Sequence, residues 1–134
     1  MTYLKPKLFS IGSYRDSRGF LGVIQGLDLP FSIERVFWLD EVPPGTVRGG
    51  HAHVESQQVL ICTHSIIKAS LEDLKGETFD FELVNDQSAL YIPPKVWGSF
   101  LFENDARAIA LASDPFSEED YIRDYQSFKA LAIG

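Results

Sequence analysis

The amino-acid sequence predicts an all-β protein, a sandwich or barrel of short strands followed by a short C-terminal helical segment. Short runs rich in β-branched and aromatic residues recur along the 134 residues, and Gly, Pro, Asn and Asp separate these runs as turn residues do. Helical spacing of apolar residues is confined to the tail. There is no linker, repeat or low-complexity segment, so we expect residues 1–134 to form a single domain with a substantial core.

The expected strands are bounded by residues that favour turns. In chain order they cover residues 8–11, 20–24, 33–39, 54–61, 65–71, 78–83, 88–92, 99–102 and 106–112. The turns and breaks between strands are expected at residues 16–19, 42–45, 73–76, 93–94 and 103–105. A fold of this kind closes its sheet edges or covers them with a partner.

The tail has a different pattern. Ser117 has the character of a helix N-cap, and the acidic residues 118–120 follow it, where the helix dipole favours negative charge. Apolar residues then recur at roughly helical spacing as far as Phe128. We therefore expect one or two short helices between Ser117 and Leu131.

Charge and cysteine content limit the partners and the compartment. A formal net charge of −7 argues against a nucleic-acid partner, although a few arginines could still hold a small anionic ligand. The single cysteine, Cys62, cannot form an intramolecular disulfide, which fits a cytoplasmic protein, and its apolar neighbours predict a buried thiol. No run approaches about 20 apolar residues, and the N-terminus has no signal-peptide core, so we expect no membrane contact.

The run RGGHAH at residues 48–53 places two of the three histidines one residue apart. If the run is extended, both imidazoles lie on the same face, because side chains at positions i and i+2 of a strand point the same way. Histidine is the commonest metal ligand and also carries protons near neutral pH. The pair therefore indicates either a metal site or a site of proton transfer.

The metal interpretation is the weaker one. The spacing of His51 and His53 resembles the first motif of the cupins, which are double-stranded β-helix (jelly-roll) barrels. The glutamate of that motif falls on Gln57, and the histidine of the second cupin motif falls on Gly98. An amide and a glycine cannot replace a carboxylate and an imidazole as ligands. We therefore expect a cupin-type barrel without a metal or another cofactor.

Proton transfer is the stronger interpretation. A base that removes a proton next to a carbonyl needs a pKa near neutral, which imidazole has, and a second ring can relay a proton between two oxygens. Arg48 offers a forked donor for a phosphate or carboxylate, and the glycines after it allow close approach of a ligand. The pair suits enolisation, which moves a carbonyl along a carbon chain.

Several motifs in order resemble the sugar 3,4-ketoisomerases (WxcM-like cupins). They are Arg35-Val36-Phe37-Trp38, the RGGHAH run, Tyr91-Ile92-Pro93-Pro94-Lys95-Val96-Trp97, Ala112-Ser113-Asp114 and Glu119-Asp120-Tyr121-Ile122-Arg123-Asp124-Tyr125. The resemblance covers about residues 8–130. It implies a metal-independent isomerase that moves the ketone of a dTDP-linked 4-keto-6-deoxyhexose from C4 to C3 through an enediol. It also implies deoxysugar biosynthesis, such as that of lipopolysaccharide, and a homodimer with exchanged N-terminal strands.

Carried onto this sequence, the resemblance makes His51 and His53 the catalytic base and the proton relay. We expect substrate contacts from Arg48, Arg18, Trp97, Gln57 and Phe37. Two departures matter, because family members usually have tyrosine at Phe37 and histidine or arginine at Gly98. These departures favour one alternative, a weakly active or non-catalytic cupin that binds a nucleotide sugar. A metal-dependent cupin is a third possibility.

Overall fold

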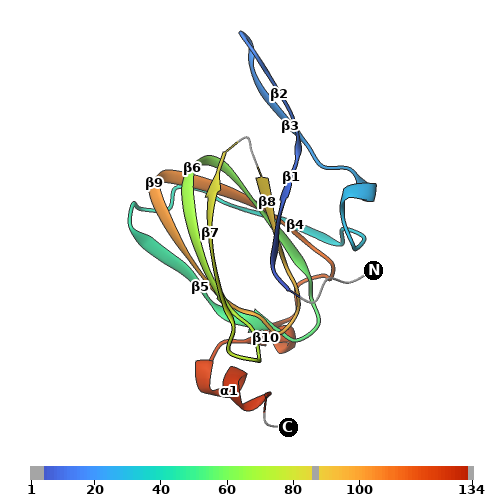
Figure 1. Ribbon diagram of the computed structural model, residues 1–134, viewed down its shortest axis with the longest axis vertical. Coiled ribbons are helices and arrows are strands. Elements are labelled where there is room, and N and C mark those ends of the chain that lie inside the picture. The colour runs from blue at the N-terminus through green and yellow to red at the C-terminus, as the bar shows by residue number, and fades with distance from the viewer. Residues whose placement is uncertain (1–4, 86–87, 133–134) are drawn as a thin grey trace.

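The computed structural model describes residues 5–85 and 88–132, which form a β-barrel with one short helix (Figure 1). The strands are β1 (Lys7–Ser10), β2 (Gly12–Asp16), β3 (Gly19–Val23), β4 (Arg35–Leu39), β5 (Thr46–His53), β6 (Gln58–Glu72), β7 (Thr78–Val84), β8 (Ser88–Ile92), β9 (Trp97–Ala112) and β10 (Tyr121–Ile122). Two 3₁₀ turns, η1 (Gly26–Asp28) and η2 (Glu118–Asp120), and the helix α1 (Tyr125–Ala130) complete the described elements. The all-β prediction and the short helical tail are confirmed.

The barrel sheet is antiparallel throughout, with the order β1-β8-β6-β9-β5-β10. Strand β4 also pairs with β9, and β7 also pairs with β6. The strands β2 and β3 form a separate hairpin. It projects beyond the barrel at the end opposite α1 (Figure 1).

The two longest strands, β6 and β9, pair along their whole lengths, from Gln58 opposite Ala112 to Glu72 opposite Trp97. The sequence predicted each of them as two strands, and this division is wrong. The polar residues 103–105 mark a bend with left-handed backbone at Asn104 and Asp105, and β6 has its own register shifts opposite. Such bulges bend a strand without ending it, so pairing continues on both sides.

Two further expectations differ from the structure. Residues 54–57 were expected to open a strand but form a bend before β6. The strand β2 was not expected, because residues 12–16 carry the polar and small side chains GSYRD, which resemble a loop. All five residues of β2 are exposed and the strand is held by its pairing with β3. It therefore lacks the alternation of apolar and polar side chains by which a strand is predicted.

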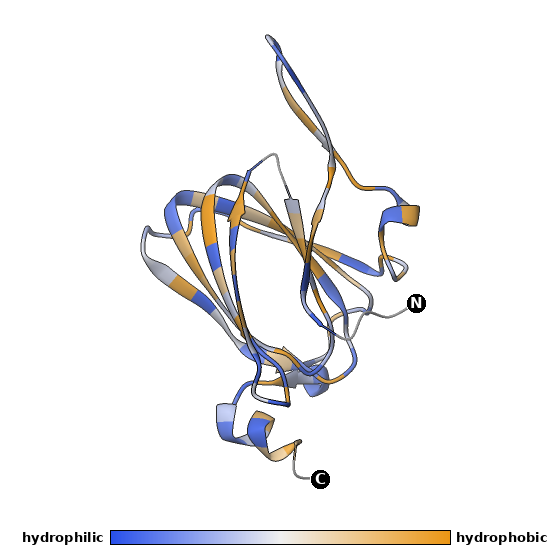
Figure 2. Cartoon of the chain, viewed as in Figure 1, coloured by the Kyte–Doolittle hydropathy of each residue, from blue (hydrophilic) through white to orange (hydrophobic). Residues whose placement is uncertain are grey.

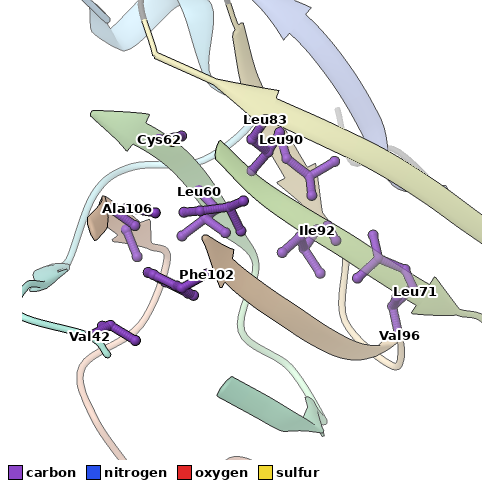
Figure 3. Packing of buried hydrophobic residues seen from close by; sticks show 14 residues of the cluster. Val42, Leu60, Cys62, Leu71, Leu83, Leu90, Ile92, Val96, Phe102 and Ala106 are labelled. Carbon is purple, nitrogen blue, oxygen red and sulfur yellow. The ribbon is translucent and has the colours of Figure 1, made fainter. Parts of the chain in front are cut away.

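The main core lies inside the barrel between β6, β7, β8 and β9. Figure 3 shows Leu60, Phe102 and Ile92 pointing toward one another there, and Phe102 is 1% exposed. The prediction that Cys62 is a buried core thiol is confirmed, and burial raises the pKa of this thiol to about 11. No helix in the described part of the chain is long and apolar enough to cross a membrane.

Candidate active site

The two histidines of the RGGHAH run lie at the end of β5, where this strand pairs with β10. Their ring centroids are 5.1 Å apart and the rings are nearly perpendicular. The ring of Tyr121, on β10, packs against both, with centroids 5.0 Å from His51 and 4.4 Å from His53. The prediction that the two imidazoles share one side of an extended segment is confirmed.

His51 opens into a cavity of about 260 Å³ within the barrel. The polar lining residues are Arg48, His51, Gln58, Tyr121 and Arg123. The apolar lining residues are Phe37, Leu39, Leu60, Ile92, Phe100, Phe102 and Ala110. This volume lies just below the usual range for ligand sites, about 300–1,000 Å³, so the cavity suits one sugar ring better than a whole nucleotide sugar.

His53 lies behind this cavity and is only 5% exposed. Its Nδ1 is 2.9 Å from Oδ2 of Asp120, and its Nε2 is 3.1 Å from Nε2 of Gln58. The other carboxylate oxygen of Asp120 accepts a hydrogen bond from the backbone N–H of Glu55 at 2.8 Å. Both ring nitrogens of His53 are therefore occupied, and Gln58 stands between this ring and the cavity.

Both rings are held in their neutral form near pH 7. The pKa of His51 is lowered from its ordinary 6.5 to about 4, chiefly by burial and also by the nearby His53 and Arg123. Burial also lowers the pKa of His53, although its hydrogen bond to Asp120 acts in the opposite direction. A neutral imidazole has a free lone pair, so His51 can accept a proton from a molecule in the cavity.

The lowered pKa of His51 predicts that the protein loses stability on acidification. The folded-state pKa of about 4 lies below the unfolded value of 6.5, so the unfolded chain binds the proton first. The stabilising effect is complete above pH 6.5 and is lost as the pH falls through 4. Urea denaturation of the wild type and His51→Gln between pH 4 and 7 measures it. An equally steep pH dependence in the variant would contradict the prediction.

The structure brings some of the expected substrate contacts to this cavity but not others. Arg48 and Phe37 line it. Arg18 lies in the turn of the β2–β3 hairpin, and its side chain is 88% exposed and paired with Asp16. Trp97 packs against Tyr125 and Phe128, with ring centroids 5.4 and 5.8 Å away.

Gln57 also lies outside the cavity, because its Oε1 accepts a hydrogen bond from the buried Tyr91 hydroxyl at 2.7 Å. The neighbouring Gln58 takes the position at the cavity. Gln58, Asp120, Tyr121 and Arg123 were not predicted as site residues from the sequence. One signal could have found Gln58, since it alternates with Leu60, which also faces the barrel interior.

Arg123 lies between β10 and α1, not within the expected helix. Its guanidinium makes two hydrogen bonds to the Glu118 carboxylate, at 2.6 and 2.9 Å, and stacks over the Tyr121 ring at 4.2 Å. The carboxylate and the ring hold it in place at the cavity wall. Arg48 and Arg123 thus give an acidic protein a local positive site.

A group of three or more His, Cys, Asp or Glu side chains that could hold a metal is not found among residues 5–85 and 88–132. At the two positions where the cupin motifs carry further ligands, the chain has Gln57 and Gly98. The donor set of a cupin metal centre is therefore not assembled from the described side chains.

The model of the family described as "FdtA: WxcM-like, C-terminal" matches residues 4–132. The chain belongs to this WxcM-like family. The relative named TDP-4-oxo-6-deoxy-alpha-D-glucose-3,4-oxoisomerase, from Aneurinibacillus thermoaerophilus, is 35% identical in an alignment of 131 residues that covers 94% of this chain and 91% of the relative.

Two solved structures of the QdtA 3,4-ketoisomerase from Thermoanaerobacterium thermosaccharolyticum resemble this WxcM-like chain. One, in complex with TDP, is 33% identical with a TM-score of 0.89, over 97% of this chain and 96% of QdtA. The other is an H51N mutant in complex with TDP-4-keto-6-deoxyglucose, 32% identical with a TM-score of 0.89, over 98% and 96%. These likenesses confirm the expected family and the cupin-type jelly-roll fold.

The two departures from the usual WxcM-like pattern have a structural setting. Phe37 lines the cavity, and the Arg35 guanidinium lies 5.1 Å from its ring centroid. A Cβ at Gly98 would lie 2.9 Å from the Leu71 side chain and 3.0 Å from the ring of Phe100. In this chain Phe100 thus takes up the space next to residue 98, and this part of the cavity wall is apolar.

Proposed function

We propose that this protein is a metal-independent isomerase that moves the ketone of a dTDP-linked 4-keto-6-deoxyhexose from C4 to C3. The observation that carries the proposal is the neutral His51 imidazole, which faces a sugar-sized cavity between two arginines. The names of the similar proteins support the same reaction and substrate class.

The reaction needs one base that works on two neighbouring carbons. His51 removes the proton from C3, and the C–H electrons form the C3–C4 double bond of an enediol while the C4 oxygen takes up a proton from solvent. The C3 hydroxyl then releases its proton to solvent as the C3 carbonyl forms, and His51, whose N–H exchanges with solvent, delivers a proton to C4. Atoms and electrons balance, and the product is an isomer of the substrate.

The substrate contacts follow from the cavity lining. Arg48 and Arg123 supply positive charge for the diphosphate, and Phe37 forms an apolar wall beside the sugar. Arg18 reaches a substrate only in a neighbouring copy of the chain, because its hairpin projects from the barrel. We assign no substrate contact to Gln57 or Trp97, whose side chains pack elsewhere.

A homodimer with exchanged N-terminal strands is part of the proposal. The side chains of Tyr14, Phe20 and Leu21 on the projecting hairpin are exposed, and Trp38 on β4 is 71% exposed. Figure 2 shows apolar stretches along this hairpin. Aromatic and aliphatic side chains exposed together mark a contact surface.

The nucleotide-linked substrate and the single buried thiol support a cytoplasmic location, and the acidic charge opposes a nucleic-acid or membrane partner.

We expect the protein to sediment at about twice the 15.1 kDa of one chain. Leu21→Asp places a charge in the apolar hairpin and is expected to shift the protein toward the monomer. Analytical ultracentrifugation of both proteins at micromolar concentration measures this. A wild type that sediments as a monomer would refute the exchanged dimer.

The proposed reaction is tested by NMR of the sugar ring protons. The protein is incubated in D₂O with dTDP-4-keto-6-deoxyglucose, and we expect a 3-keto product with deuterium on the ring carbon that His51 reprotonates. The departures at Phe37 and Gly98 favour a second candidate, a binding protein without turnover. Stabilisation against heat by TDP, without turnover of any dTDP-linked 4-keto-6-deoxyhexose and without deuterium exchange, would establish that candidate and overturn the isomerase.

A further inference from the structure

We propose that Asp120, His53 and Gln58 form one hydrogen-bonded chain, in which the Gln58 carboxamide contacts the two reacting oxygens of the substrate. In this chain Asp120 is a positioning residue that acts through His53. The inference rests on the proposed isomerase function and deepens it. It gives the buried histidine a role other than direct transfer of protons to the substrate.

The chain begins at a carboxylate that can only accept hydrogen bonds. Asp120 accepts from the Glu55 backbone N–H through Oδ1 and lies 2.9 Å from Nδ1 of His53 through Oδ2. The hydrogen of the neutral His53 ring therefore sits on Nδ1, and Nε2 carries the lone pair. The Gln58 amide, 3.1 Å away, donates one N–H to that lone pair. Asp120 thus determines that the NH₂ group of the Gln58 amide, and not its oxygen, contacts His53.

The same arrangement decides which group meets the substrate. Gln58 lines the cavity, whereas His53 does not and is 5% exposed. Within residues 5–85 and 88–132, no hydrogen bond involves the Oε1 or the second N–H of Gln58. A molecule in the cavity therefore meets one free donor and one free acceptor of this amide.

These two groups match the chemistry of an α-hydroxy ketone. The ketone oxygen at C4 accepts a hydrogen bond, and the hydroxyl at C3 donates one. As His51 removes the C3 proton, negative charge develops on the C4 oxygen, and an oriented N–H that is already in place stabilises this charge. The amide oxygen accepts from the neighbouring hydroxyl, which holds the two oxygens in register with the base.

The chain also predicts how a change at Asp120 reaches the cavity. Asp120→Asn replaces an acceptor with an amide that can donate to Nδ1 of His53. The ring hydrogen then moves to Nε2, and Gln58 must turn its Oε1 toward His53 to accept it. The cavity then meets only N–H donors, and the acceptor for the substrate hydroxyl is lost.

The experiment compares Gln58→Leu and Asp120→Asn with a matched control, Gln57→Leu, which loses a hydrogen bond outside the cavity. Turnover of dTDP-4-keto-6-deoxyglucose by NMR gives kcat and KM, and ¹⁵N NMR of the imidazoles gives the His53 tautomer without turnover. We expect Gln58→Leu and Asp120→Asn each to lower kcat by about 10²-fold, as loss of an oriented donor does, with KM changed by less than about 3-fold. Gln57→Leu should keep kcat within about 2-fold.

The tautomer separates positioning from a merely structural role. We expect His53 to carry its hydrogen on Nδ1 in the wild type and in Gln58→Leu, and on Nε2 in Asp120→Asn. Should Gln58→Leu fail to fold, the nearly isosteric Gln58→Glu tests the same contact, because it keeps the volume but has no N–H donor. Retained kcat in a folded Gln58 variant, or an unchanged tautomer in Asp120→Asn, overturns the inference. A wild type without turnover overturns the proposed function instead, so the two failures are distinct.

Discussion

Replacing His51 with asparagine is expected to lower kcat by about 10²- to 10⁴-fold, the usual contribution of a general base. His51 is the ring of the pair that lines the cavity, and its lowered pKa keeps it neutral and ready to accept the C3 proton. Asparagine has a similar polarity and no basic nitrogen. Deuterium exchange into the sugar ring, followed by NMR in D₂O, measures the loss at the step that His51 performs.

The third histidine provides the control for this variant. His64 lies on β6, is exposed, and bonds to the backbone oxygen of Asp105 rather than to the cavity. His64→Asn should exchange deuterium at the wild-type rate. TDP should stabilise His51→Asn against heat as it does the wild type, because the arginines remain. Wild-type exchange in a folded His51→Asn would exclude this imidazole as the base.

Replacing Gly49 with alanine is expected to destabilise the protein by about 3 kcal/mol or more, through left-handed strain and overpacking together. Gly49 has φ +93°, and a Cβ there would lie 2.7 Å from the backbone oxygen of Gly98 and 2.9 Å from the Phe100 ring. A backbone oxygen within a paired strand cannot move aside as a flexible side chain can. Urea denaturation measures the change in the free energy of unfolding.

The neighbouring Gly50 separates the two causes. Its φ of +73° is also left-handed, but a Cβ would meet nothing within 4 Å. Gly50→Ala should therefore cost only the backbone strain, roughly 1–2 kcal/mol. Equal losses in the two variants would show that the close approach of β5 to Gly98 does not limit residue 49.

The histidine pair and the strand character of most segments could be predicted from local sequence. Alternation within the RGGHAH run placed both imidazoles on one side because that segment is a strand in the structure. The glutamine could not be assigned in the same way. Residues 54–57 interrupt the strand, and alternation counted across this break from the histidines does not give the face of Gln58.

Long-range contacts could not be predicted at all. Asp120 has the sequence signature of an acidic residue in the first turn of a helix, yet it lies 67 positions from its partner His53. Only the pairing of β10 with β5 brings the two together. The continuity of β6 and β9 through their bends could not be predicted for a similar reason. Each register shift depends on how the two strands pair and not on the residues next to it in the sequence.

The buried cysteine allows opening of the folded structure to be measured without an added label. Cys62 is the single thiol and is 1% exposed, and its raised pKa leaves little thiolate at neutral pH. An alkylating reagent therefore modifies this thiol only when the structure around Cys62 opens to solvent. The rate of mass increase under iodoacetamide then gives the opening equilibrium in native buffer, without denaturant and without an engineered label.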